Sequence, residues 1–358
     1  MNAAADVLNG QANAQADRLI PDLLDEYGAA TRAVLKSYLP NKEPRRYLYD
    51  LVADYPSRGG KMMRPSICIA VTRAFGGCEE DALQCAAALE LIHNAMLVHD
   101  DIEDESEERR GRPTLHKEWG VPLALNAGDM LTLLSLRPLL DNRRRLGDEL
   151  AARIVRETER VAVESAEGQA IELGWRLDND VTITEADYLE MVLKKTCWLA
   201  TIYPVRVGAL IGTRNSIEPD RFIRFGFFLG AAFQIQDDLL NLVGDDSYGK
   251  ERDGDLWEGK RTLMLTHTLA SCTPAERSLI ERTLGQERDD KDPDDVAALR
   301  DMMDAYGSID YARQVAQGLG GAALSEFDRA FAGLPPSRDL EFLRGLPTWV
   351  FSRHTHSA

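Results

Sequence analysis

The five cysteines of this 358-residue chain include no pair in CxxC spacing, so the usual pattern of a zinc site or a redox dithiol is missing. We expect free thiols in a reducing compartment at all five positions, which are Cys68, Cys78, Cys85, Cys197 and Cys272. The chain also has no excess of positive charge: its formal net charge of −17 argues against nucleic-acid binding, which needs a basic surface. An anionic substrate remains compatible with this charge, because a site can concentrate lysine, arginine and a divalent cation locally.

Long hydrophobic runs are absent as well. The N-terminal stretch has neither the basic start nor the apolar segment of a signal peptide. The longest apolar run is FGFFLGAAF at 225–233, far short of the ~20 residues that a membrane-spanning helix needs. We interpret this run as part of a buried helix and expect a soluble, cytoplasmic protein.

Aromatic residues make up only 7% of the chain, and no stretch alternates with period two long enough to predict a sheet. Apolar residues instead recur at three- and four-residue spacing, which predicts an all-α bundle. The sequence shows no internal repeat or linker, so we expect a single domain over 1–358, with flexible ends at 1–14 and 352–358. Breaks are predicted at 56–60, 76–77, 109–113 and 244–260, and a surface loop at 289–295. The predicted helices cover residues 15–38, 46–54, 62–75, 80–103, 121–140, 147–173, 184–211, 217–243, 261–270, 274–284, 298–305, 308–331 and 339–345.

The first acidic cluster lies in the segment VHDDIEDESEERRGRP. Asp100 and Asp104 are four residues apart, so on a helix they share a face with Cβ atoms ~5–6 Å apart, while Asp101 points sideways. Two carboxylates on one face suit magnesium, which takes oxygen ligands and keeps water and substrate phosphate in its shell. A solvated acidic face is the alternative. The apolar segment upstream favours the metal, because carboxylates at the end of a buried helix are costly unless they bind something or reach water.

The second cluster lies in AAFQIQDDLLNLVGDD, where Asp237 and Asp238 again follow a long apolar helix. Asn241 stands four residues beyond Asp237 and offers a carbonyl oxygen without charge, so this site should hold metal more weakly. Two apolar helices that each end in acids predict two facing metal platforms above an apolar, central active-site cavity. Such a cavity suits a substrate with a diphosphate head and a hydrocarbon tail.

Basic residues stand beside both clusters. Lys61 and Arg64 follow a Gly-Gly turn at helical spacing, and Arg109 and Arg110 follow the first acids. Lys195 lies in LKKTCW, and Lys250 and Lys260 flank the segment GKERDGDLWEGK. Each alone is best explained as a surface cation, but their joint placement at turns and helix ends favours an anion-binding role.

The motifs GGKMMRP, LIH, DDIED with RRG, NAGD, KKT, FQIQDD and GKERDGDLWEGK occur in this order. The sequence therefore resembles the trans-polyprenyl diphosphate synthases over about residues 40–270. The resemblance implies the isoprenoid synthase fold, a homodimer and a magnesium-dependent prenyltransferase. The implied reaction condenses isopentenyl diphosphate with an allylic diphosphate by ionisation, condensation and elimination, with the departing diphosphate as the base.

The resemblance also implies roles for individual residues. Asp100, Asp104 and Asp237 match the principal magnesium ligands, with Asp101 and Asp238 in support. The positions that match the allylic diphosphate site are Arg109, Lys195, Lys250 and Lys260. Those that match the isopentenyl diphosphate site are Lys61, Arg64, His93 and Arg110. Thr196 and Gln234 match polar groups that face the developing carbocation.

Product length should depend on the floor of the cavity. Short-product members of the family commonly carry an aromatic residue at one of two positions below the first motif, where this chain has Ala95 and Met96. We therefore expect geranylgeranyl diphosphate, with a longer-chain or farnesyl product as the alternative. Simple core packing would also explain both residues.

Two other functions were weighed. A terpene cyclase would share the fold, but it would lack Lys61, Arg64 and a second Asp-Asp pair. A non-catalytic partner subunit of a prenyl synthase should have eroded motifs, whereas Asn241 is the one departure among the metal positions.

Overall fold

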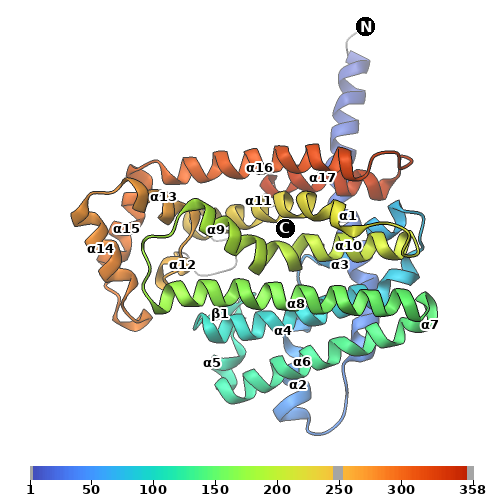
Figure 1. The fold of residues 1–358 in the computed structure, drawn as a ribbon, viewed down its shortest axis with the longest axis horizontal. Helices are drawn as coiled ribbons and strands as arrows, with labels where there is room; N and C mark the ends of the chain where they lie inside the picture. The colour runs from blue at the N-terminus through green and yellow to red at the C-terminus, as the bar shows by residue number, and fades with distance from the viewer. Residues whose placement is uncertain (1–2, 245–252, 353–358) are drawn as a thin grey trace.

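The computed structural model describes residues 3–244 and 253–352, and it confirms the all-α prediction (Figure 1). The long helices are α1 (Ala3–Tyr38), α3 (Met63–Ala74), α4 (Glu79–Glu103), α6 (Val121–Asp141), α8 (Asp148–Leu177), α10 (Tyr203–Gly212), α11 (Ile223–Val243), α14 (Pro274–Leu284), α15 (Pro293–Ala305), α16 (Ser308–Ala330) and α17 (Arg338–Ser352). The shorter ones are α2 (Asp50–Ser57), α5 (Leu115–Trp119), α7 (Arg143–Leu146), α9 (Glu185–Val192), α12 (Gly254–Trp257) and α13 (Leu263–Ser271). The helices are joined in part by two π-helices, η1 (Arg45–Tyr49) and η2 (Leu193–Ile202). There are also two described 3₁₀ turns, η3 (Pro219–Phe222) and η5 (Arg288–Asp290).

A small hairpin interrupts the helical pattern after the first acidic motif. Strands β1 (Glu108–Arg109) and β2 (Arg112–Pro113) pair antiparallel where the sequence predicted only a break. Arg110 and Gly111 form the turn with φ of 55° and 70°, and a two-residue hairpin turn with positive φ at both positions matches the twist of the strands. Strands of two residues are too short for alternation to reveal, which is why the sequence did not predict them.

The predicted helix 184–211 is divided into α9, η2 and α10. π-helical segments are rare and often mark functional sites. Neighbouring helices come close to η2: a Cβ on Gly168 of α8 would lie 2.2 Å from the backbone nitrogen of Lys195. The lack of a side chain at this glycine therefore lets α8 pack directly against the η2 backbone.

Two predicted loops contain helical structure. The break at 244–260 includes α12. The acidic run at 289–295 was expected to be a surface loop, but it contains part of η5 and the start of α15, where the side chain of Asp292 accepts the backbone N–H of Asp294. Acidic residues stabilise the first turn of a helix, so the same composition fits a helix start.

The hydrophobic core has two parts. The larger cluster lies among α3, α4, α8, η2, α10, α11, α16 and α17, and the smaller one lies between α4, α2 and α6. In Figure 1, α4 runs between α8 and α6, while α10, α11 and α16 lie on the other side of α8. This arrangement gives α4 a place in both clusters.

Two expectations about the chain as a whole can be checked against the fold. All five cysteines are free thiols, as predicted. Within the described residues, no helix combines the length and the apolar composition needed to cross a membrane.

Candidate functional site

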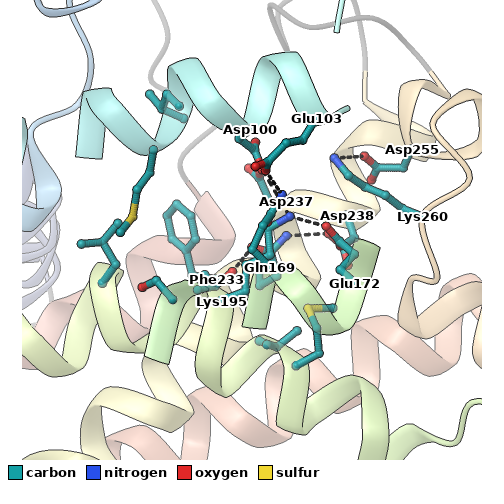
Figure 2. A pocket seen from close by; sticks show the side chains of 18 of the residues that line it. Asp100, Glu103, Gln169, Glu172, Lys195, Phe233, Asp237, Asp238, Asp255 and Lys260 are labelled. Atoms are coloured by element: carbon teal, nitrogen blue, oxygen red, sulfur yellow. Dashed lines mark hydrogen bonds and ion pairs between the residues drawn. The ribbon is translucent and has the colours of Figure 1, made fainter. Parts of the chain in front are cut away.

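A cavity of about 390 Å³ opens between α4, α8, η2 and α11. Figure 2 shows acids and lysines at one end of it, with Asp100 and Glu103 on α4 facing Asp237 and Asp238 on α11. The apolar part of the wall comes from Met96, Leu97, Met191, Val192, Leu199 and Phe233. The cavity therefore joins a charged region to an apolar one.

Asp100 lies at the charged end, near the end of α4. Its carboxylate is 3.3 Å from Lys195 Nζ and 3.8 Å from an Arg109 nitrogen. Burial raises the pKa of Asp100, but Lys195, Lys260 and Arg109 together outweigh burial and hold this pKa well below its usual range. The carboxylate is therefore ionised and ready to bind a cation.

Asp101 is on a different face of α4 and does not line the cavity. It is fully buried and accepts hydrogen bonds from the Tyr55 hydroxyl and from Arg109, whose Nε lies 2.9 Å away. Burial raises the pKa of Asp101, with Arg109 and Tyr55 opposing this effect. These contacts hold Arg109 beside Asp100, whereas the predicted role of Asp101 as a supporting magnesium ligand stays a prediction.

Asp104 caps the C-terminal end of α4, and its side chain is only 1% exposed. One oxygen lies 2.5 Å from Arg176 Nη1, and the other lies 3.0 Å from Lys260 Nζ. Asp104 therefore faces the same cations as the cavity residues, although it is not itself part of the cavity wall.

Asp237 and Asp238 both line the cavity from α11. Asp238 is the end of a hydrogen-bonded chain: Thr196 donates to Gln234 Oε1 at 2.8 Å, and Gln234 Nε2 donates to Asp238 Oδ1 at 2.7 Å. Tyr188 donates to the other Asp238 oxygen at 2.7 Å. Burial raises the pKa of Asp238 to about 6, although both of these hydrogen bonds lower it. These hydrogen bonds orient the Thr196 and Gln234 side chains toward one another in the cavity wall.

Asn241 does not point a free oxygen at the cavity. Its Oδ1 accepts the backbone N–H of Asp255 at 3.0 Å, and its backbone oxygen accepts the N–H of Asp253. Asp255 in turn lines the cavity, with a carboxylate oxygen 3.7 Å from Lys260 Nζ (Figure 2). Asn241 thus contributes no carboxylate here, but it binds the backbone of Asp255, whose carboxylate does line the cavity.

Lys195 and Lys260 are the cations of the charged end. Lys195 contacts Glu172 as well as Asp100, and Lys260 lies 2.6 Å from Glu258. Burial alone would lower the pKa of both lysines, but these carboxylates and those of Asp104 and Asp255 raise both pKa values above the ordinary range. Both side chains are therefore charged. Lys250, predicted to act with them, lies outside the described residues.

The residues predicted to bind isopentenyl diphosphate divide into two pairs. Arg64 and His93 line the cavity. Lys61 and Arg110 are not part of the cavity wall: Lys61 is 5.8 Å from the Trp349 ring centroid, and Arg110 donates to the backbone oxygen of Tyr55 at 3.2 Å. A Cβ on Gly60 would come within 3.0 Å of Arg110, so the glycine turn before Lys61 makes room for this arginine.

His93 has a buried acidic partner that the sequence did not identify. Its Nδ1 is 3.3 Å from Glu90, which also accepts a hydrogen bond from Asn94 at 3.1 Å. Burial and the nearby Arg64 lower the pKa of His93 to about 4, even though Glu90 raises it. His93 is therefore neutral near pH 7.

The two predicted chain-length residues lie on different faces of α4. Met96 is part of the cavity wall. Ala95 is 1% exposed and belongs to the smaller core cluster, between α4 and α6. Only Met96 contacts the cavity directly.

Sequence motifs did not identify the contribution of α8. Its residues Gln169 and Glu172 line the cavity, as do Ser165 and Ala166, at spacings of three and four residues. Gln169 donates to Glu103 at 2.6 Å, and Glu172 accepts from Lys195. Polar residues at this spacing within an apolar helix face were the available signal.

The donor set fits a hard divalent cation. The side chains at the charged end offer carboxylate oxygens, which magnesium prefers. No three His, Cys, Asp or Glu side chains converge on one point within residues 3–244 and 253–352. An ion here would need oxygens from substrate or water, as is usual for magnesium.

Comparisons with known proteins agree with this geometry. A sequence model described as Polyprenyl synthetase matches residues 45–303. The geranylgeranyl diphosphate synthase of Sulfolobus acidocaldarius is 34% identical over 285 residues, which cover 79% of this chain and 84% of the relative.

Solved structures match as well. Geranylgeranyl pyrophosphate synthetase from Pyrococcus horikoshii is similar with a TM-score of 0.82 and 33% identity, over 94% of this chain and 99% of that one. Geranylgeranyl pyrophosphate synthase from Corynebacterium glutamicum, solved with isoprenyl diphosphate and magnesium, gives a TM-score of 0.80 and 27% identity, over 92% and 99%. The helical fold and its paired aspartate helices thus define an isoprenoid synthase. The chain belongs to the polyprenyl synthetase family, and it is a trans-prenyltransferase.

Proposed function

We propose that the protein condenses isopentenyl diphosphate with an allylic diphosphate and makes geranylgeranyl diphosphate. The observation that carries this proposal is one cavity with acids and lysines at one end and an apolar wall at the other. Such a cavity matches a substrate with a charged head and a hydrocarbon tail. The 34% identity with a geranylgeranyl diphosphate synthase supports the length of the product.

Magnesium is the proposed metal, held by Asp100, Asp104 and Asp237 with Asp101 and Asp238 in support. When bound, it would neutralise charge on the leaving diphosphate as a Lewis acid. The Corynebacterium glutamicum relative was solved with this metal, which supports the choice.

Arg109, Lys195 and Lys260 would bind the allylic diphosphate, together with Lys250. Each of the first three contacts a carboxylate of the first motif in the absence of ligand. On binding, we expect these cations to exchange a carboxylate for phosphate oxygens. They would then stabilise the charge that grows on the diphosphate as its bond to carbon breaks.

Isopentenyl diphosphate would bind at Lys61, Arg64, His93 and Arg110. Holding it beside the allylic carbon makes attack by its double bond an effectively unimolecular step. Thr196 and Gln234 would direct their oxygen dipoles at the cation, and the departing diphosphate would take the proton that the new double bond releases. Exclusion of water by the cavity walls protects the cation from quenching.

Met96 is the proposed chain-length residue, because its flexible side chain narrows the apolar part of the cavity. Ala95 could influence product length only indirectly, through the packing of α4 on α6.

We also propose a homodimer formed through α6. Its outer face carries a stripe of apolar side chains that are 46–65% exposed, namely Val121, Leu125, Leu133, Leu136 and Leu140. The opposite face of α6 packs on α4. An exposed apolar stripe of this length is typical of a protein interface, and a second copy of the chain is the partner that the family resemblance implies.

A product assay tests the function. The protein would receive magnesium, labelled isopentenyl diphosphate and, in turn, dimethylallyl, geranyl or farnesyl diphosphate, and the dephosphorylated products would be sized by chromatography. We expect geranylgeraniol as the main product, lost on chelation of the metal. A ladder of longer products would contradict the role of Met96, and no elongation by folded protein would favour a partner subunit.

A further inference from the structure

Arg176 is a cation at the charged end that no motif identified. It lies in the last turn of α8, and its Nη1 is 2.5 Å from Asp104 Oδ1. Its Nη2 also donates to the backbone oxygen of Glu103 at 3.3 Å. Both contacts are at the C-terminal end of α4, where the helix dipole favours a positive charge.

The two oxygens of Asp104 have different surroundings. Oδ1 contacts Arg176, whereas Oδ2 lies 3.0 Å from Lys260 Nζ. Oδ2 is buried, and no described residue gives it a hydrogen bond of good geometry. Lys260 therefore supplies an opposite charge to Oδ2 but no well-aligned hydrogen bond, so this oxygen can still accept a ligand.

The two cations that contact Asp104 also differ in place. Lys260 lines the cavity, where a diphosphate can draw its ammonium away from Oδ2 (Figure 2). Arg176 is not part of the cavity wall. A metal that enters from the cavity would therefore meet Oδ2, and Arg176 could remain on Oδ1.

Two other cations, Arg261 and Lys291, interact electrostatically with Arg176. Burial lowers the pKa of Arg261 to about 10 and that of Lys291 to about 8, and in both cases Arg176 is the next contributor. Among these cations, Arg176 is the one that contacts the Asp104 Oδ1 atom, through its Nη1.

We propose that Arg176 is a positioning residue that fixes the Asp104 carboxylate, so that Oδ2 remains available to the divalent cation. This rests on the proposed role of Asp104 as a metal ligand. Hydrogen-bonded partners behind a metal ligand commonly set its orientation, and their loss costs ~10–100-fold in metal affinity. The competing hypothesis is that Arg176 blocks Asp104, in which case its removal would tighten metal binding.

The test compares Arg176→Gln and Arg176→Lys with wild type. Binding of Mn²⁺ to the protein alone would be followed by electron paramagnetic resonance, and the Mg²⁺ concentration for half-maximal condensation would be measured separately. We expect Arg176→Gln to weaken Mn²⁺ binding and to raise the half-maximal Mg²⁺ concentration, each by about tenfold or more. Arg176→Lys should lie in between, because it restores the charge but not the two donor groups of the guanidinium. Arg153→Gln is the matched control: Arg153 is also on α8, but it contacts Asn215 and Glu218.

Two results would overturn this role. Unchanged or tighter Mn²⁺ binding in Arg176→Gln would do so, as would an equal loss in Arg153→Gln. A failure of the metal site itself is distinguishable, because Asp104→Asn would then leave Mn²⁺ binding unchanged. If Arg176→Gln fails to fold, the comparison of Arg176→Lys with wild type decides the question.

Discussion

Gly168→Ala adds a single methyl group at the contact between α8 and η2, and we expect it to impair catalysis severely. The new Cβ would lie 2.2 Å from the backbone nitrogen of Lys195 and 2.7 Å from its Cα. Ordinary contact begins at 3.4 Å, so the two backbones must separate by about 1 Å. Both atoms that clash belong to the backbone, which cannot rotate away as a side chain can.

The separation moves Lys195, whose Nζ is 3.3 Å from Asp100. A misplacement of ~1 Å at a catalytic site can cost ~100-fold in rate, and overpacking a core typically costs ~1–3 kcal/mol in stability. The higher helix propensity of alanine offsets up to ~1 kcal/mol of this loss in the free energy of unfolding. The net loss of stability should therefore be small beside the loss of activity.

The assay is steady-state condensation with farnesyl and isopentenyl diphosphate, together with urea denaturation. Gly174→Ala is the matched control on the same helix, because no atom would lie within 4 Å of its new Cβ. We expect this control to keep full activity and to gain ~0.5–1 kcal/mol in stability. Wild-type activity in Gly168→Ala would refute the proposed close packing of α8 on η2.

Three further predictions concern the cavity floor, the buried histidine and the outer face of α6. Met96→Phe should shift the product toward farnesyl diphosphate, whereas Ala95→Ser should leave product size unchanged; chromatography of the products checks both. Burial lowers the pKa of His93 from 6.5 to about 4, so the unfolded chain binds a proton between these pH values that the folded protein does not. As the pH falls from 6.5 to 4, the free energy of unfolding of wild type should decrease by up to about 3 kcal/mol relative to that of His93→Gln, at 1.36 kcal/mol per pKa unit. Urea denaturation measures this difference, and parallel pH profiles of the two proteins would contradict the burial effect. Leu133→Glu should produce a monomer by light scattering, while Leu177→Glu, at an exposed position on α8, should not.

The helices and the main acids of the site could be predicted because both depend on local spacing. Asp100 and Asp237 each follow an apolar run of helical period, so their place in the C-terminal half of a helix is visible in the sequence. The close approach of α8 to η2 at Gly168 could not be predicted in the same way. That contact joins residues 27 positions apart and leaves no periodic signal.

The partners of the predicted residues were also beyond local patterns. Arg176 meets Asp104 across 72 positions, and Tyr188 meets Asp238 across 50. Asn241 shows the same limit: the sequence marks it as a weaker metal ligand, but only the fold shows that it accepts the backbone N–H of Asp255. Tertiary contacts of this kind depend on helix packing, which composition and periodicity do not encode.

The most direct measurement is mass spectrometry of the products formed from farnesyl and isopentenyl diphosphates with magnesium. We expect one geranylgeranyl diphosphate for each diphosphate released, with Asp100→Asn reducing the yield by orders of magnitude while the protein stays folded. Release of diphosphate without a new carbon–carbon bond, or an unreacted mixture from folded wild-type protein, would contradict the proposed condensation.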